Sequence, residues 1–96
     1  MALTGAQLHD LLQRKWGRSY DLQIFRRGER LYLQVMWRYL GQGSFALSED
    51  QYEARLERIS AYLSELGVQQ QVVDFLMSTR EKPRIGRAVS FALEVE

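Results

Sequence analysis

The spacing of apolar residues along the chain predicts three helices. Two of them open with a capping box, in which a Ser or Thr side chain and a Gln three residues later satisfy free backbone N–H groups. These boxes are Thr4 with Gln7 and Ser48 with Gln51. Behind each box, apolar residues follow at steps of three and four up to a glycine, Gly17 or Gly67, that ends the helix. The pattern predicts helices over residues 5–16 and 49–66, and a shorter one that ends at about Thr79 because Pro83 prevents its continuation.

Alternation of apolar and polar residues predicts three strands. Residues 20–24 and 31–38 alternate on either side of a glycine turn, and so predict a β-hairpin. Trp37 shares a strand face with Leu31, Leu33 and Val35 and is therefore expected in the core. Residues 89–95 alternate in the same way and predict a C-terminal strand.

The element order is therefore expected to be αββααβ. We expect a single two-layer α+β domain over residues 1–96, with the hairpin and the C-terminal strand in one sheet and the helices packed chiefly on one face. The pattern leaves open which face of the hairpin is exposed.

Composition excludes several classes of protein. The 96-residue chain has no cysteine, which excludes disulfides, thiolate zinc sites and a cysteine nucleophile. No apolar run reaches the roughly 18 residues of a membrane span, and the N-terminus does not resemble a signal peptide. We therefore expect a soluble, unexported protein.

Charge is segregated along the sequence although the net charge is only +1. Residues 1–47 carry seven Lys/Arg and three Asp/Glu, whereas residues 48–79 carry two Lys/Arg and six Asp/Glu. Eleven of the 13 cations are Arg, whose planar fork suits carboxylate and phosphate partners. A bipolar surface follows, unless the segments interleave on folding.

The candidate binding residues lie between the third helix and the last strand. They are Arg80, Lys82, Arg84 and Arg87. If Pro83 keeps this segment extended, the first three cations point to one side and Glu81 to the other. The small residues Gly86, Ala88, Ser90 and Ala92 are then expected to share one face of the strand that follows. Because phosphate sites usually add glycines or a helix N-terminus, the expected partner is an acidic protein surface, with a phosphate ligand or a purely solubilising role as alternatives.

Residues suited to catalysis are sparse. The only histidine, His9, has no accompanying ligand cluster, so we expect a structural or solvent-exposed role for it. Glu49, Glu53 and Glu57 form a candidate acidic ridge at i, i+4 spacing, where their mutual repulsion mildly favours a partner. No nucleophile, base or nucleotide-binding motif accompanies the ridge, and a solvated helix face is its simplest interpretation. The sequence predicts no enzyme, no metal and no cofactor.

The order αββααβ also occurs in one class of KH domain, which grips nucleic acid through a GXXG loop between paired helices. The corresponding loop, Glu65–Gln70, has one glycine and no cation. Phe25, Tyr32 and Tyr39 could serve instead as stacking platforms for bases. An RNA- or phosphate-binding module without a GXXG loop is therefore the alternative function.

Three stretches of the sequence resemble one family. LLQRKWGRSYD (residues 11–21), LQVMWRYLGQGSFALSEDQY (33–52) and TREKPRIGRAVSFAL (79–93) look like signatures of small uncharacterised proteins of cyanobacteria and plastids. The resemblance implies a cytoplasmic setting in a photosynthetic cell, stromal for plastid relatives, and brings no activity or site residue. The resulting hypothesis is a non-catalytic protein-binding or assembly module that uses a basic, Arg-rich surface; its pathway, partner and oligomeric state stay open.

Overall fold

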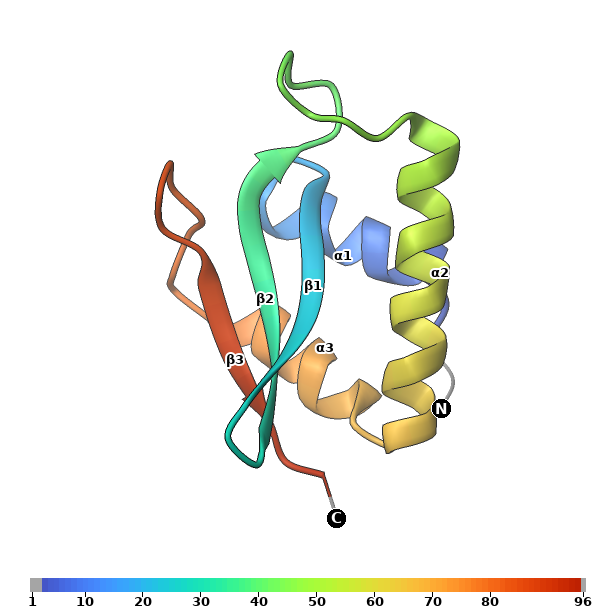
Figure 1. The fold of residues 1–96 in the computed structure, drawn as a ribbon, viewed down its shortest axis with the longest axis vertical. Helices are drawn as coiled ribbons and strands as arrows, with labels where there is room; N and C mark the ends of the chain where they lie inside the picture. The colour runs from blue at the N-terminus through green and yellow to red at the C-terminus, as the bar shows by residue number, and fades with distance from the viewer. Residues whose placement is uncertain (1–2, 96) are drawn as a thin grey trace.

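The structure, a computed structural model, describes residues 3–95. In chain order its elements are α1 (Gly5–Trp16), β1 (Tyr20–Arg27), β2 (Arg30–Tyr39), α2 (Glu49–Leu66), α3 (Gln69–Ser78) and β3 (Val89–Leu93). The strands form one antiparallel sheet in the order β1-β2-β3. Figure 1 shows α1 and α3 behind the sheet and α2 beside β1, so that the front face of the sheet carries no helix of the described chain. The α+β class and the order αββααβ are confirmed.

Local sequence signals set the helix ends. Both capping boxes form, at Thr4 and at Ser48. Gly17 and Gly67 each end a helix in the left-handed region, with φ of 71°. Non-glycine residues adopt that region only with strain, so these two glycines determine where α1 and α2 stop.

One apolar core joins the helices to the rear face of the sheet. Its most deeply buried side chains come from every element, and include Leu8, Leu12, Leu22, Leu33, Tyr52, Leu56, Leu63, Val72, Leu76 and Val89. Within residues 3–95, no helix is both long and apolar enough to cross a lipid bilayer.

Trp37 departs from the prediction. The hairpin pairs Leu22 with Val35 but Tyr20 with Tyr39, so β2 carries two more residues than β1 between these pairs. Trp37 lies in this irregular segment and is half-buried. It lines a hollow with Lys82–Ile85 instead of joining the buried core. The expectation of a fully buried Trp37 is wrong, because simple alternation cannot anticipate a bulge.

Candidate functional site

The candidate binding residues lie on residues 80–87, here called the basic loop, which connects α3 to β3. After α3, the backbone turns at Thr79, whose side chain accepts a hydrogen bond from the Glu81 N–H. A tight turn follows at Arg84–Arg87, closed by two backbone hydrogen bonds of 3.0 and 2.7 Å between these residues. Gly86 occupies the turn with a φ of 78°, a conformation that favours glycine. It therefore lies in a turn, not on the strand face where it was expected.

The basic loop is attached to the body of the protein at its first half. The Trp16 indole N–H donates to the Glu81 carbonyl over 3.2 Å. Pro83 is buried, and with Trp37 and Tyr39 it lines a hollow of about 220 Å³ under the loop. These contacts hold residues 81–83 of the loop in place, which lowers the entropy that binding through this part would otherwise cost.

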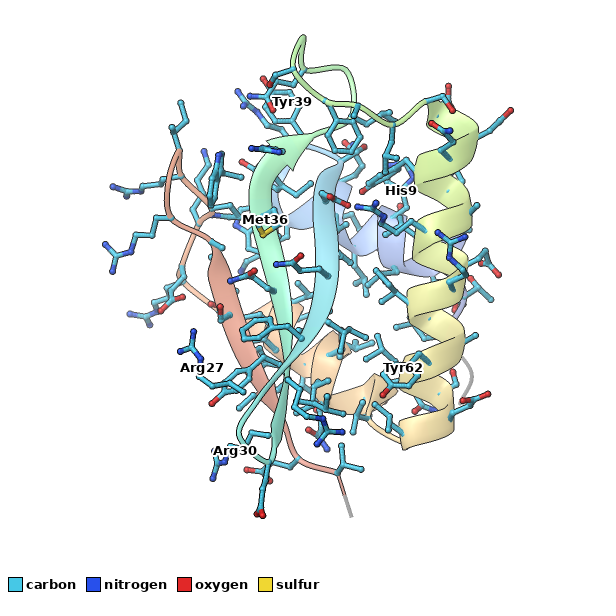
Figure 2. All side chains as sticks on the ribbon, in the orientation of Figure 1. His9, Arg27, Arg30, Met36, Tyr39 and Tyr62 are labelled. Carbon is cyan, nitrogen blue, oxygen red and sulfur yellow. The ribbon has the colours of Figure 1, made fainter. Side chains whose placement is uncertain are left out.

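All four candidate cations line one further hollow, of about 240 Å³. They are Arg80, Lys82, Arg84 and Arg87; each is exposed, and none forms an ion pair with a residue of the described chain. Glu81 contributes to the same lining, so the expected placement of Glu81 on the opposite side is not what the structure shows. Figure 2 shows nitrogen-tipped side chains extending from this loop away from the sheet.

The tip of the basic loop is apolar. Ile85 lies between Arg84 and Arg87 and is 90% exposed. The next most exposed large apolar side chain of the described residues is Met77, at 69%. An isolated exposed apolar residue is ordinary on a protein surface, and the distinguishing feature of Ile85 is its place in a closed turn between two exposed cations.

The candidate acidic ridge is partly occupied from within the chain. The Glu53 carboxylate lies 2.6 Å from His9 Nδ1, and the Glu57 carboxylate accepts a hydrogen bond from the Gly5 N–H at the start of α1. Only glycine fits at position 5, because a Cβ there would lie 2.8 Å from the Glu57 backbone nitrogen. Two of the three carboxylates therefore join α2 to α1, and Glu49 is exposed in the first turn of α2.

His9 belongs to a network that the sequence did not indicate. Its Nε2 lies 2.6 Å from Ser19 Oγ, and the Gln13 amide donates to the same oxygen over 2.5 Å. With Glu53 on Nδ1, these side chains adopt the serine–histidine–carboxylate order of some hydrolases. Ser19 is only 7% exposed, however, and a nucleophile must be reachable by its substrate. The network therefore ties α1 and α2 to the start of β1, which agrees with the structural role expected for His9.

Tyr52 is held beside this network. Its hydroxyl donates to the Tyr20 carbonyl over 2.7 Å, and its ring meets His9 edge-on. Burial raises the pKa of the Tyr52 hydroxyl well above its usual value of 10.0, and the nearby carboxylates of Asp21 and Glu53 raise it further. The hydroxyl therefore remains a hydrogen-bond donor. Among residues 3–95, no cluster of three or more His, Cys, Asp or Glu side chains is arranged to hold a metal ion.

The aromatic residues considered for base stacking are partly covered. Phe25 and Tyr32 stack on each other at 5.2 Å between ring centres, and the Arg27 guanidinium lies 5.8 Å from the Phe25 ring centre. Tyr39 packs edge-on against Tyr20 and lies under the Arg18 guanidinium. These contacts occupy ring faces that stacked bases would need.

Comparisons with known proteins give a family and a solved relative. Residues 6–96 match the domain of unknown function DUF3067. The solution NMR structure of the Alr2454 protein from Nostoc sp. strain PCC 7120 has a TM-score of 0.93 to this fold. The two sequences are 46% identical over 96% of this chain and 88% of the Nostoc chain. No curated protein matches this sequence.

Proposed function

The chain belongs to the DUF3067 family, as the resemblance to uncharacterised cyanobacterial proteins indicated, and from this premise we propose that it is a non-catalytic protein-binding or assembly module whose basic loop binds an acidic protein surface. Its setting would be the cytoplasm of a photosynthetic cell, or the stroma for plastid relatives. The family brings no activity with it, so the proposal rests on the chain's own residues.

The observation that carries the proposal is the combination of charge, shape and support in the basic loop. Ile85 supplies an apolar anchor, and Arg84 and Arg87 flank it with side chains that form no ion pair with a described residue. Interfaces typically bury an apolar or aromatic anchor inside a polar rim. An acidic surface with a small apolar recess would complement this tip, with the carboxylates facing the two arginines.

The chain offers a matched control for testing this proposal. Arg84 and Arg87 face each other across a two-residue turn, and so do Arg27 and Arg30 at the opposite end of the molecule. The variants R84E/R87E and R27E/R30E therefore change the net charge equally and reverse the same kind of residue pair. Both should keep the free energy of unfolding within about 0.5 kcal/mol of the parent chain, because exposed charges contribute little to stability.

Each variant is used as bait in extract from the native cell, with and without nuclease. The proposal expects a protein that the parent chain and R27E/R30E retain after nuclease, and that R84E/R87E and Ile85→Ser lose. Retention by all variants would contradict it. Binding that nuclease abolishes, and that weakens steeply with salt as phosphate contacts release counterions, would favour the RNA-binding alternative instead.

A further inference from the structure

A wide, open hollow of about 640 Å³ lies along the free edge of β1. We call it the edge groove and define it by Ile24 and Arg26 of β1 together with Arg55, Arg58, Ile59 and Tyr62 of α2. Figure 2 shows Tyr62 on the part of α2 that faces the sheet. A strand edge beside a helix is a layout that binds extended peptides, because the edge supplies hydrogen bonds and the helix supplies side-chain contacts.

Strand geometry determines which backbone groups of β1 face this groove. Arg27 and Arg30 close a two-residue hairpin turn, and the residues that close such a turn bond to each other. Along an antiparallel strand the direction of the backbone N–H and C=O groups alternates, so residues 23, 25 and 27 face β2. Leu22, Ile24 and Arg26 then direct their backbone groups outward, into the groove.

One end of this edge is closed by a side chain. Asp21 Oδ1 accepts the Leu22 N–H over 3.0 Å, and Arg55 holds the same carboxylate at 2.7 and 2.9 Å. Further along, Ile24 and Arg26 present backbone groups that bond to no described residue outside the sheet. Exposed strand edges attract other strands, and proteins usually cover them or protect them. Here one end is protected and the next two outward-facing residues are open.

The positive charge of the edge groove favours an acidic occupant. Arg26 and Arg58 form no ion pair with a described residue, Arg55 is paired only with Asp21, and no carboxylate lines the groove. A second copy of this chain is a poor occupant, because it would bring its own Arg26 and Arg58 to a groove that the same two cations already line, and like charges repel. An acidic strand has no such repulsion.

From this placement we propose that the edge groove binds an extended acidic segment of a partner protein, which adds to the sheet as a fourth strand beside β1. Its backbone pairs with Ile24 and Arg26. Alternate side chains face α2, where apolar ones contact Ile59 and Tyr62 and acidic ones reach Arg26 or Arg58. This site lies on the other edge of the sheet from the basic loop, and so the inference does not depend on the function proposed for that loop.

Short random peptides displayed on phage supply a probe that does not require the partner to be identified. After selection against the folded parent chain, enriched sequences should carry apolar and acidic residues two positions apart, because such residues share the strand face toward α2. A synthetic copy of one of them should shift the NMR amide signals of Ile24, Arg26 and Ile59. Methylation of alternate backbone nitrogens in this peptide should weaken binding about tenfold or more, because strand pairing needs those N–H groups.

Two substitutions at one position separate backbone pairing from charge. Arg26→Gln removes the cation only, whereas Arg26→Pro also removes the outward N–H and is tolerated on an edge strand. Arg26→Pro should bind the selected peptide about tenfold more weakly than Arg26→Gln does, while urea unfolding shows both variants folded. The charge-reversed basic loop, R84E/R87E, serves as the control and should bind the peptide like the parent chain.

Five results would overturn this proposal. Four of them are an absence of enriched peptides, equal binding by Arg26→Pro and Arg26→Gln, amide shifts confined to residues 80–89, and groove shifts that follow the concentration of the protein itself. The last of these would make a second copy the occupant. Equal groove shifts with oligouridine RNA would also contradict it.

Discussion

Two turns at opposite ends of the molecule are each closed by a pair of arginines, but they differ in backbone structure and in the chemistry of their tips. Arg27 pairs with Arg30 around Gly28–Glu29, and Arg84 pairs with Arg87 around Ile85–Gly86. Figure 1 shows the first turn at the lower end of the β1–β2 hairpin and the second standing apart from the sheet, ahead of β3. In the first turn pairing continues along β1 and β2, whereas in the second it stops after one bridge.

The position of the glycine explains this difference in pairing. Gly28 is the first central residue of its turn and has a φ of 62°, the arrangement of a type II′ turn. Gly86 is the second central residue of its turn with a φ of 78°, the arrangement of a type II turn. The twist of type II′ turns matches paired strands, while that of type II turns splays them. The first turn therefore extends a hairpin, and the second forms a short projection.

The tips differ in chemistry as well. Glu29 places a carboxylate between the arginines of the first turn, and Ile85 places an exposed apolar side chain between those of the second. The first tip offsets part of its positive charge, whereas the second combines two cations with an exposed apolar group. The comparison teaches that matching Arg pairs carry little functional information until the turn between them is known.

The largest expected effect is a loss of folding stability at alkaline pH. It bears on the comparison because β1 and the basic loop are attached to the rest of the protein through different groups. The strand of the first turn is held by the Tyr52 hydroxyl on the Tyr20 carbonyl, and the basic loop by the indole of Trp16, which does not titrate. The raised pKa of Tyr52 leaves stability intact below pH 10.0, where the phenol is protonated in both states. Above it, the unfolded chain releases the proton and the folded chain does not. The free energy of unfolding should then fall by about 1.4 kcal/mol per pH unit.

Urea unfolding at pH 9 and pH 11 measures this loss. Because alkaline pH affects a protein in several ways at once, Tyr52→Phe is the control, and its loss of stability should be smaller by about 1.4 kcal/mol. Equal losses in the free energy of unfolding of both proteins would show that ionisation of the Tyr52 hydroxyl does not cause the loss, and that this hydroxyl is not what attaches β1.

A smaller effect should separate the two glycines. Neither Gly28 nor Gly86 has a heavy atom within 4 Å of the position of an added Cβ, so Ala introduces backbone strain and no clash. Gly28→Ala should lower the free energy of unfolding by about 1 kcal/mol, because the paired strands hold its positive φ in place. Gly86→Ala should cost less than about 0.5 kcal/mol, because the single bridge can open locally. Equal costs would show that the basic loop is as rigidly held as the hairpin.

The smallest effect on stability should come from exchanging the tips. Glu29→Ile and Ile85→Glu both change exposed positions and should alter the free energy of unfolding by less than about 0.5 kcal/mol. Binding of the acidic partner recovered through the basic loop should fall for Ile85→Glu and be unaffected by Glu29→Ile. Unchanged binding by Ile85→Glu would remove the apolar tip from the proposed interface.

The residues of the edge groove and of the His9 network show where sequence reasoning stops. The sequence assigns Ile24 and Arg26 only to a strand and a turn. It assigns Arg58 and Tyr62 to a helix more than 30 residues away along the chain. Their common hollow depends on how α2 lies beside β1, which no local pattern encodes. Likewise Ser19, His9 and Glu53 come from three parts of the sequence, and no motif spacing connects them.

Local chemistry by itself determined the elements and their ends. Three signals come from neighbouring residues: the capping boxes at Thr4 and Ser48, the glycines after α1 and α2, and the spacing of apolar residues, at steps of three and four in helices and at every second residue in strands. Together they predicted the order αββααβ correctly. The four cations of the basic loop were also proposed from the sequence, as a run interrupted by Pro83 and Gly86, and in the structure they line one hollow. Tertiary structure decided that Trp37 lies in a bulge, that Glu53 and Glu57 contact α1, and that β1 keeps a free edge beside α2. Those outcomes depend on packing between distant segments, where the approach of two elements sets which side chains meet and which backbone groups remain unpaired.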